Sequence, residues 1–308
     1  MIDRTHHTTR IAPSPTGMFH LGSARTALFN WLAARATDGR FILRIDDTDQ
    51  TRHSDAAVQV IFDALDWLRL PYDACVRQSD RLSIYRKLAD DLVSHGLARR
   101  DGAAIRLAVS DMPDFWNDTL AGQIAISAQD RRVISELVLL RSDGMPTYHL
   151  ASVVDDMDLG ITWVIRGSDH LSNTPKHIAL WRAVGKLEWS GAAAPMPLWT
   201  HLGLITSDGK KISKRDGAAS LLDYRDSGVD PDAMVNWLLR LGWGPTIDDK
   251  TTRTIDRDRA VRLFLEGGRM RASPANMDPL LQSALDRKYK GMRGRAAAAL
   301  SASLLLPH

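Results

Sequence analysis

The sequence predicts an α/β protein built on a parallel, doubly wound sheet, with a short insertion between two halves and a helical C-terminal region. Strand and helix patterns alternate through the first hundred residues, weaken between about 99 and 130, and then resume until Asp230. After Asp230 the pattern is helical. Alternating strands and helices are typical of a parallel sheet with helices on both faces.

The elements of the first half follow from apolar spacing and from glycines that end helices. They are a strand over 9–12, a helix carrying Leu21, Ala24, Leu28 and Trp31 and ending at Gly39, an apolar strand over 40–45, a helix carrying Val58, Ile61, Leu65 and Leu68, and a helix carrying Ile84, Leu88 and Leu92 and ending at Gly96. A short, wholly apolar strand is typical of a buried parallel sheet.

The second half repeats this alternation. Its expected elements are a strand over 137–140, a helix over 148–155, a strand over 161–165, a helix over 174–184, a strand over 198–205, a helix carrying Ala233, Trp237, Leu238 and Leu241 and ending at Gly242, and a terminal helix over 296–306. We therefore divide the chain into a first half of the catalytic sheet over 1–98, an insertion over 99–135, a second half over 136–228 and a helical region over 229–308.

Composition excludes several classes of protein. The 308 residues are 44% hydrophobic and 25% charged, which is ordinary for a soluble globular protein. No apolar stretch is long enough to span a bilayer, and the polar start lacks the apolar core of a secretory signal. The single cysteine, Cys75, excludes an internal disulfide and a multi-cysteine zinc site. We expect a cytoplasmic protein with no membrane association, no structural zinc and no metal ligands of its own.

The basic residues are clustered. The net charge is +3, and two runs concentrate Lys and Arg: Lys210, Lys211, Lys214 and Arg215, and Arg287, Lys288, Lys290, Arg293 and Arg295. Each run taken alone is typical of a solvated surface, but both also fit a polyanionic partner.

A glycine-bearing turn with a histidine lies where the first strand leads into the first helix. Gly17 and Gly22 allow close approach of the backbone, and the start of a helix offers unpaired N–H groups to an anion. His20 can donate a hydrogen bond to a phosphate oxygen. The segment is a candidate phosphate site, although such a turn alone is more often purely structural.

A second candidate is the basic loop over 207–217. Lys211 and Lys214 flank Ser213 between glycines, so the loop could close over a triphosphate and neutralise charge as pyrophosphate leaves. A preorganised donor of this kind is typically worth ~3 kcal/mol in a transition state.

The two segments together resemble the paired signatures of class I aminoacyl-tRNA synthetases. The first signature reads His20-Leu21-Gly22-Ser23 and the second reads Lys211-Ile212-Ser213-Lys214-Arg215. Four further strings narrow the resemblance to the glutamyl-tRNA synthetase family: Thr9 to Gly17, Arg44-Ile45-Asp46-Asp47-Thr48-Asp49, Gly144 to Ala151, and Val164-Ile165-Arg166-Gly167. The resemblance implies a Rossmann-like catalytic core.

The resemblance also implies a role for each matching residue. Arg10 and Tyr148 correspond to residues that bind the side-chain carboxylate of glutamate, with Ala12, Ser14 and Ser152 in the same pocket, Arg166 at the α-carboxylate and Asp46 at the α-amino group. His20, Gly22, Asp169, Lys211, Ser213 and Lys214 correspond to residues that bind ATP, and His20, Lys211 and Lys214 to those that assist departure of pyrophosphate. The implied cofactors are ATP and Mg²⁺, and the implied partners are glutamate or a related amino acid and the acceptor end of tRNA.

The sequence departs from the family pattern in several places. Asp46 stands where the family has glutamate, and Ser152 where it commonly has asparagine. The insertion is shortened, and the sequence ends at His308 without a segment that resembles an anticodon-binding domain. Four hypotheses about function therefore stay open: an enzyme that activates glutamate and transfers it to tRNA, a synthetase of the glutamyl-queuosine type that modifies a tRNA nucleotide, a tRNA-independent ligase, or a non-catalytic RNA-binding paralogue.

Overall fold

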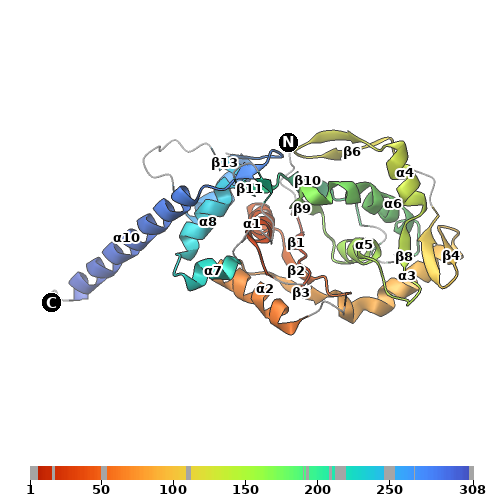
Figure 1. The fold of residues 1–308 in the computed structure, drawn as a ribbon, viewed down its shortest axis with the longest axis horizontal. Helices are drawn as coiled ribbons and strands as arrows, with labels where there is room; N and C mark the ends of the chain where they lie inside the picture. The colour runs from red at the N-terminus through yellow and green to blue at the C-terminus, as the bar shows by residue number, and fades with distance from the viewer. Residues whose placement is uncertain are drawn as a thin grey trace.

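A computed structural model shows the arrangement of these elements (Figure 1). It describes residues 6–15, 18–49, 54–108, 112–189, 191, 194–207, 210–211, 220–245, 254–266 and 268–304. The α/β class and the strand–helix alternation predicted from the sequence are confirmed.

The first half is a parallel sheet with one helix after each of its first two strands. Its elements are β1 (Thr9–Ile11), α1 (Leu21–Ala36), β2 (Phe41–Ile45), α2 (Asp55–Trp67) and β3 (Ala74–Arg77), and the strands lie in the order β1-β2-β3. A 3₁₀ turn, η1 (Gln78–Arg81), and α3 (Leu82–Ser94) follow β3. The register places Arg10 beside Ile42, so Arg10, Ile42 and Arg44 point to the same face of the sheet.

The second half continues the sheet from the other side of β1. It contains α5 (Tyr148–Asp158), β9 (Trp163–Gly167), η2 (Ser168–Asn173), α6 (Thr174–Val184) and β10 (Leu198–Leu202). The amides of Thr162 and Trp163 donate to the Thr8 carbonyl at 3.0 and 3.3 Å, so the start of β9 lies against the start of β1. The strand order across both halves is therefore β3-β2-β1-β9-β10, with the direction of winding reversed between β1 and β9.

The insertion forms two small β structures that the sequence pattern did not reveal. Its elements are β4 (Ala98–Asp101), β5 (Ala104–Leu107), β6 (Phe115–Asp118), β7 (Gly122–Ala125) and α4 (Ala128–Ser135), followed by β8 (Val138–Leu140). β4, β5 and β8 form one antiparallel sheet. The β6–β7 hairpin instead extends the central sheet, because Trp199 in β10 pairs with Asp118 in β6.

Alternate residues of the central strands enter different cores. Phe41, Leu43 and Ile45 belong to the largest apolar cluster, which α1, α2, α8 (Pro231–Arg240) and α9 (Arg257–Glu266) complete on one face. Ile42 and Val164 belong to a separate cluster on the opposite face. The sheet is therefore covered on both faces, as the apolar strands predicted.

Helix α1 ties the two halves together. The Asn30 side chain donates to the Ile165 carbonyl at 3.0 Å, and Arg25 donates to the carbonyls of Gly203 and Leu241 at 2.6 and 3.0 Å. Both side chains are buried. The partners of Asn30 and Arg25 lie in the second half and in the region after it. Helix α1 therefore fixes the positions of the first half, the second half and the C-terminal region relative to one another.

The chain after β10 combines short strands with helices. Its remaining elements are β11 (Ile205–Ser207), β12 (Lys210–Lys211), α7 (Leu221–Asp226), β13 (Trp243–Pro245), β14 (Gly268–Met270), β15 (Ala275–Asn276) and α10 (Pro279–Leu304). Helix α10 packs against α8 and then extends away from the body (Figure 1). Of the part of the chain that the structure describes, no helix is both long and apolar enough to cross a membrane.

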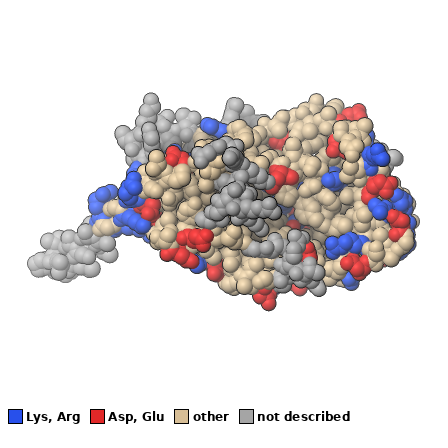
Figure 2. Space-filling view, in the orientation of Figure 1, with Lys and Arg blue, Asp and Glu red and all other residues tan. Residues whose placement is uncertain are grey.

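Lys and Arg side chains gather where α10 leaves the body (Figure 2). Part of this charge is neutralised within the chain. Arg293 contacts Asp230 and Asp232 at 2.5 and 2.9 Å, and Lys290 contacts Asp286 at 2.8 Å. The Arg293 contacts stabilise the packing of α10 on α8, and the Lys290 contact lies within α10. The density of basic residues therefore overstates the charge offered to a partner.

Candidate active site

The candidate site lies at the carboxyl ends of β1 and β9, where the winding direction reverses. Ala12 and Ser14 follow β1, Asp46 follows β2, and Asp169 follows β9. The Asp46 amide donates to the Pro13 carbonyl at 3.0 Å, which joins the segments after β1 and β2. Ligands of doubly wound sheets bind in the crevice at this reversal point.

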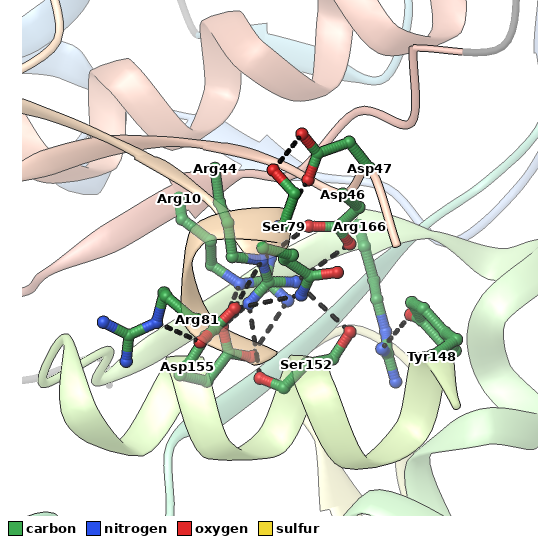
Figure 3. Close-up of polar contacts among 12 residues, drawn as sticks. Arg10, Arg44, Asp46, Asp47, Ser79, Arg81, Tyr148, Ser152, Asp155 and Arg166 are labelled. Atoms are coloured by element: carbon green, nitrogen blue, oxygen red, sulfur yellow. Dashed lines mark hydrogen bonds and ion pairs between the residues drawn. The ribbon is translucent and has the colours of Figure 1, made fainter. Parts of the chain in front are cut away.

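Arg44 is the centre of a buried network of charges (Figure 3). Its Nε and Nη2 donate to the two oxygens of Asp46 at 2.6 and 3.1 Å, and its Nη1 donates to Asp156 Oδ1 at 2.7 Å. Nη2 also donates to Ser152 Oγ at 3.2 Å, and Nη1 to the Ser152 carbonyl at 3.3 Å. Removing an ion from water costs several kcal/mol unless the ion is paired and hydrogen-bonded. The Arg44 guanidinium offsets this cost because its nitrogens are both paired with carboxylates and hydrogen-bonded.

Helix α5 supplies the acidic side of the network. Ser152, Asp155 and Asp156 are three and four residues apart, so they share the helix face that meets the sheet. Asp155 accepts hydrogen bonds from Gln78 at 3.0 Å, Arg81 at 2.7 Å and the Tyr85 hydroxyl at 2.9 Å. These bonds anchor α5 to η1 and α3 and leave Asp156 directed at the strands.

Asp46 differs electrostatically from its neighbours. Burial raises the pKa of Asp46 to about 6, although the Arg44 guanidinium acts in the opposite direction. The pKa of Asp156 is lowered despite burial, because Arg10 and Arg44 both lie against it. The network therefore contains one carboxyl that changes its charge close to neutral pH.

Two arginines present positive charge to the site. Arg10 donates from Nε and Nη2 to Asp156 at 3.0 and 3.3 Å, while its Nη1 has no hydrogen-bond partner within the described part of the chain. Arg166 donates to the Tyr148 hydroxyl at 3.4 Å and to Thr174 Oγ1 at 2.7 Å. Arg10 and Arg166 are almost fully buried and sense each other electrostatically, whereas Tyr148 is 37% exposed. Arg10, Tyr148 and Arg166 thus form a cationic wall with a hydroxyl at its edge, suited to a dicarboxylate.

The histidine turn forms the start of α1. His20 is exposed and is the N-cap residue, and its Nδ1 accepts a hydrogen bond from the Ser23 amide at 3.2 Å. A Cβ added at Gly22 would lie 3.0 Å from the His20 ring. The glycine therefore gives the imidazole room over the helix start, beside N–H groups that suit a phosphate.

The segment that follows the basic loop meets this turn. Ser220 forms an isolated antiparallel bridge with His20, and the Leu221 amide donates to the Phe19 carbonyl at 3.0 Å. Upstream, Lys210–Lys211 pairs with β11. Ser213 and Lys214 lie outside the described residues, as does the side chain of Lys211, so their predicted roles stay predictions.

The remaining predicted residues lie in different parts of the site. Asp169 is at the start of η2 and acts electrostatically on Arg25 in α1, the helix that begins at the histidine turn. Ala12 is partly buried and Ser14 is exposed. Ser152 is buried behind Arg44, so it supports the network and does not offer its hydroxyl to the surface.

Sequence reasoning missed several residues that build the site: Arg44, Arg81, Asp118, Asp155, Asp156, Thr174 and His201. Arg44 and the two aspartates of α5 carried a usable signal, because charges within apolar segments are buried only when they are paired. Asp118 lies in a segment without a clear pattern, and its partner His201 is 83 residues away.

Comparison with known proteins identifies the family of this chain. The family described as tRNA synthetases class I (E and Q), catalytic domain, matches residues 7–104 and 99–271. Glutamate–tRNA ligase 2 of Neorickettsia sennetsu is 46% identical over 237 residues, which cover 76% of this chain and 55% of that protein. The glutamate–tRNA ligase of Solibacter usitatus is 38% identical over 346 residues, which cover 97% and 71%.

A solved structure supports the fold. The glutamate tRNA ligase of Elizabethkingia meningosepticum, in complex with its amino acid, superposes with a TM-score of 0.79 at 26% identity, over 93% of this chain and 70% of that chain. The chain spans little more than half the length of the N. sennetsu relative. The family model matches most of the chain, and the candidate site lies where the winding direction of the sheet reverses. The chain therefore belongs to the family of class I tRNA synthetases (E and Q), catalytic domain.

Proposed function

We propose that this chain activates glutamate, or a close analogue, with ATP to form an acyl-adenylate and then transfers the acyl group to tRNA. The observation that carries this proposal is the cationic wall of Arg10, Tyr148 and Arg166, together with the His20 turn at the start of the helix that follows the Arg10 strand. Its two buried arginines suit an amino acid with two carboxylates, and the turn suits a nucleotide phosphate.

The residues would act mainly by positioning. Arg10 and Tyr148 would bind the side-chain carboxylate, and Arg166 would hold the α-carboxylate toward the nucleotide. One oxygen of that carboxylate then bonds to the α-phosphorus as the bond to the β-phosphate oxygen breaks, which releases pyrophosphate. Mg²⁺ carried by ATP would neutralise charge on the phosphates. Orientation of the reactants supplies most of the acceleration in such reactions.

The departures at Asp46 and Ser152 bear on the choice of amino acid. Asp46 would contact the α-amino group, yet both of its oxygens already accept from Arg44. A glutamate side chain in place of Asp46 would reach farther from the end of β2. We therefore include close analogues of glutamate in the proposal, since the distance to the amino group sets which substrate fits.

ATP–pyrophosphate exchange with a panel of amino acids, with and without total tRNA, tests the proposal. Exchange that is specific for glutamate or an analogue is expected. Absence of exchange with every acid would overturn it in favour of an RNA-binding paralogue. Transfer of labelled glutamate to the terminal ribose is expected next. Robust exchange without any transfer would point to a tRNA-independent ligase, and transfer to a modified internal nucleotide would point to the glutamyl-queuosine type.

Lys214 in the basic loop provides a more specific test. If it neutralises charge as pyrophosphate leaves, Lys214→Ala should lower kcat by about 100- to 1,000-fold with little change in the KM for ATP. A matched control is Lys186→Ala, which lies after α6 on an exposed turn. Equal changes in kcat and KM would contradict the assigned role.

A further inference from the structure

The β6–β7 hairpin of the insertion contributes a buried carboxylate to the second half. The side chain of Asp118, at the end of β6, is fully buried, and its Oδ2 accepts a hydrogen bond from His201 Nδ1 at 2.7 Å. Its Oδ1 accepts from the amides of Leu120 and Ala121 at 2.9 and 2.8 Å. Burial alone would raise the pKa of Asp118, but these three hydrogen bonds lower it, so the group is a carboxylate at neutral pH.

His201 connects Asp118 to Arg166 through its two ring nitrogens. Burial lowers the pKa of His201 despite the neighbouring carboxylate, so the imidazole is neutral at pH 7. Because its Nδ1 donates to Asp118, its Nε2 carries no proton and must accept. Arg166 Nε lies 3.1 Å from Nε2 and donates to it, and the Thr174 hydroxyl lies 3.0 Å from the same atom.

The guanidinium of Arg166 is held in one plane by these partners. Nη2 donates to Thr174 Oγ1 at 2.7 Å, Nη1 donates to Tyr148, and the group stacks over the Trp199 ring at 5.3 Å. Trp199 is the residue of β10 that pairs with Asp118 in β6. The insertion thus fixes both the ring beneath Arg166 and the imidazole beside it.

We propose that Asp118 is a positioning residue for Arg166, acting through the tautomer of His201. The inference rests on the proposed function, in which Arg166 holds the α-carboxylate, and it assigns part of amino-acid recognition to the insertion. Asp118 touches no substrate. It selects the tautomer that leaves His201 Nε2 as an acceptor, and that acceptor fixes the orientation of the guanidinium.

Asp118→Asn reverses this polarity with little change in shape. The amides of Leu120 and Ala121 both point at the Oδ1 position, so the carbonyl oxygen of the substituted side chain must occupy it. The NH₂ group then faces His201 Nδ1, which becomes the acceptor, and the ring proton moves to Nε2. Two donors, His201 Nε2–H and Arg166 Nε–H, would then face each other and displace Arg166.

Kinetics and spectroscopy test this together. In pyrophosphate exchange, Asp118→Asn should raise the KM for glutamate by about 10- to 100-fold and leave the KM for ATP unchanged, since a displacement of about 1 Å has effects of this size. In ¹⁵N–¹H spectra, the His201 proton should move from Nδ1 to Nε2. Asp114→Asn in the same hairpin is the control, because the Asp114 side chain is 88% exposed, and it should change neither measurement.

A second pair of variants protects the test against a folding defect. His201→Gln can still donate to Asp118 and accept from Arg166, so it should keep a KM for glutamate near that of the wild type. His201→Leu can do neither and should raise it. An unchanged KM for glutamate in Asp118→Asn, a parallel rise in both KM values, or equal effects of Gln and Leu would overturn the inference. Absence of exchange in the wild type would instead overturn the proposed function, and the tautomer measurement would still decide whether Asp118 controls His201.

Discussion

Asp46 and Ser152 bind the same guanidinium group, that of Arg44, although one follows a strand of the first half and the other lies on a helix of the second. These are also the two site positions at which the resemblance implies a departure from the family pattern. Because Asp46 and Ser152 share this partner, we expect substitutions at the two positions to be coupled.

A double-mutant cycle measures this coupling. Asp46→Glu and Ser152→Asn should change the KM for glutamate and the free energy of unfolding in a non-additive way, by about 0.5–3 kcal/mol, because both side chains contact Arg44. The control cycle pairs Ser152→Asn with Asp73→Glu, whose partner is the distant Arg35. Additive behaviour in both cycles would show that Arg44 does not link the two positions.

Arg44 should dominate the stability of the network. Arg44→Met leaves Asp46 and Asp156 buried without their common partner, so we expect the free energy of unfolding in urea to fall by about 3–5 kcal/mol. Arg35→Met removes a comparable ion pair, that of Arg35 with Asp73. The side chains of Arg35 and Asp73 are 27% and 33% exposed. Its expected cost is about 1 kcal/mol or less. Similar losses in the two variants would contradict a special role for burial.

The titration of Asp46 predicts a pH dependence of amino-acid binding. Its pKa is raised by burial to about 6, whereas an aspartate in an unfolded chain ionises near pH ~3.9. This carboxyl therefore favours the folded state most below about pH 4, and its contribution is lost as pH rises through about 6. Binding has the opposite sign, because only the ionised carboxylate attracts an ammonium group.

The KM for glutamate should accordingly decrease as pH rises through about 6 and then level off, while the KM for ATP changes little. Pyrophosphate exchange measured across this range checks the prediction. In Asp46→Asn the transition should disappear, since no group at that position titrates. If the same transition persists in this variant, another group causes it.

Gly22 should be required for the nucleotide step. A Cβ at this position would lie 3.0 Å from the His20 ring, so Gly22→Ala should displace the imidazole from the start of α1. We expect kcat/KM for ATP to fall by about 10- to 100-fold with little change in the KM for glutamate. Gly294→Ala is the control, because a Cβ there meets no neighbouring atom. A normal rate in Gly22→Ala would exclude the proposed contact between His20 and phosphate.

The sequence predicts the central sheet well and the insertion poorly, for physical reasons. The apolar run Phe41–Ile45 is wholly buried, and α1 follows from the spacing of Leu21, Ala24 and Leu28. The insertion strands have only four residues each, and β6 places Phe115 on its exposed side, so the hydrophobic pattern there is weak. Short strands whose stability depends on a distant neighbour leave little local signal.

The candidate site, like the fold, could be predicted only in part from the sequence. Arg10, Tyr148 and Arg166 were assigned by resemblance, and the structure brings them together at the ends of β1, α5 and β9. Resemblance did not reveal that Asp46 and Ser152 share Arg44, because that contact depends on how α5 packs on the sheet. A hydrogen bond between residues 108 positions apart is a property of the assembled layers.

The contact between Thr8 and Thr162 has a consequence for synthesis on the ribosome. Strand β1 lies in the middle of the finished sheet, but its neighbour β9 emerges more than 150 residues later. Until then β1 is an open edge with unpaired amide and carbonyl groups, which favours pairing with other nascent chains. Chaperone capture during translation should therefore be strongest before residue 167 leaves the exit tunnel and should decline once β9 has docked.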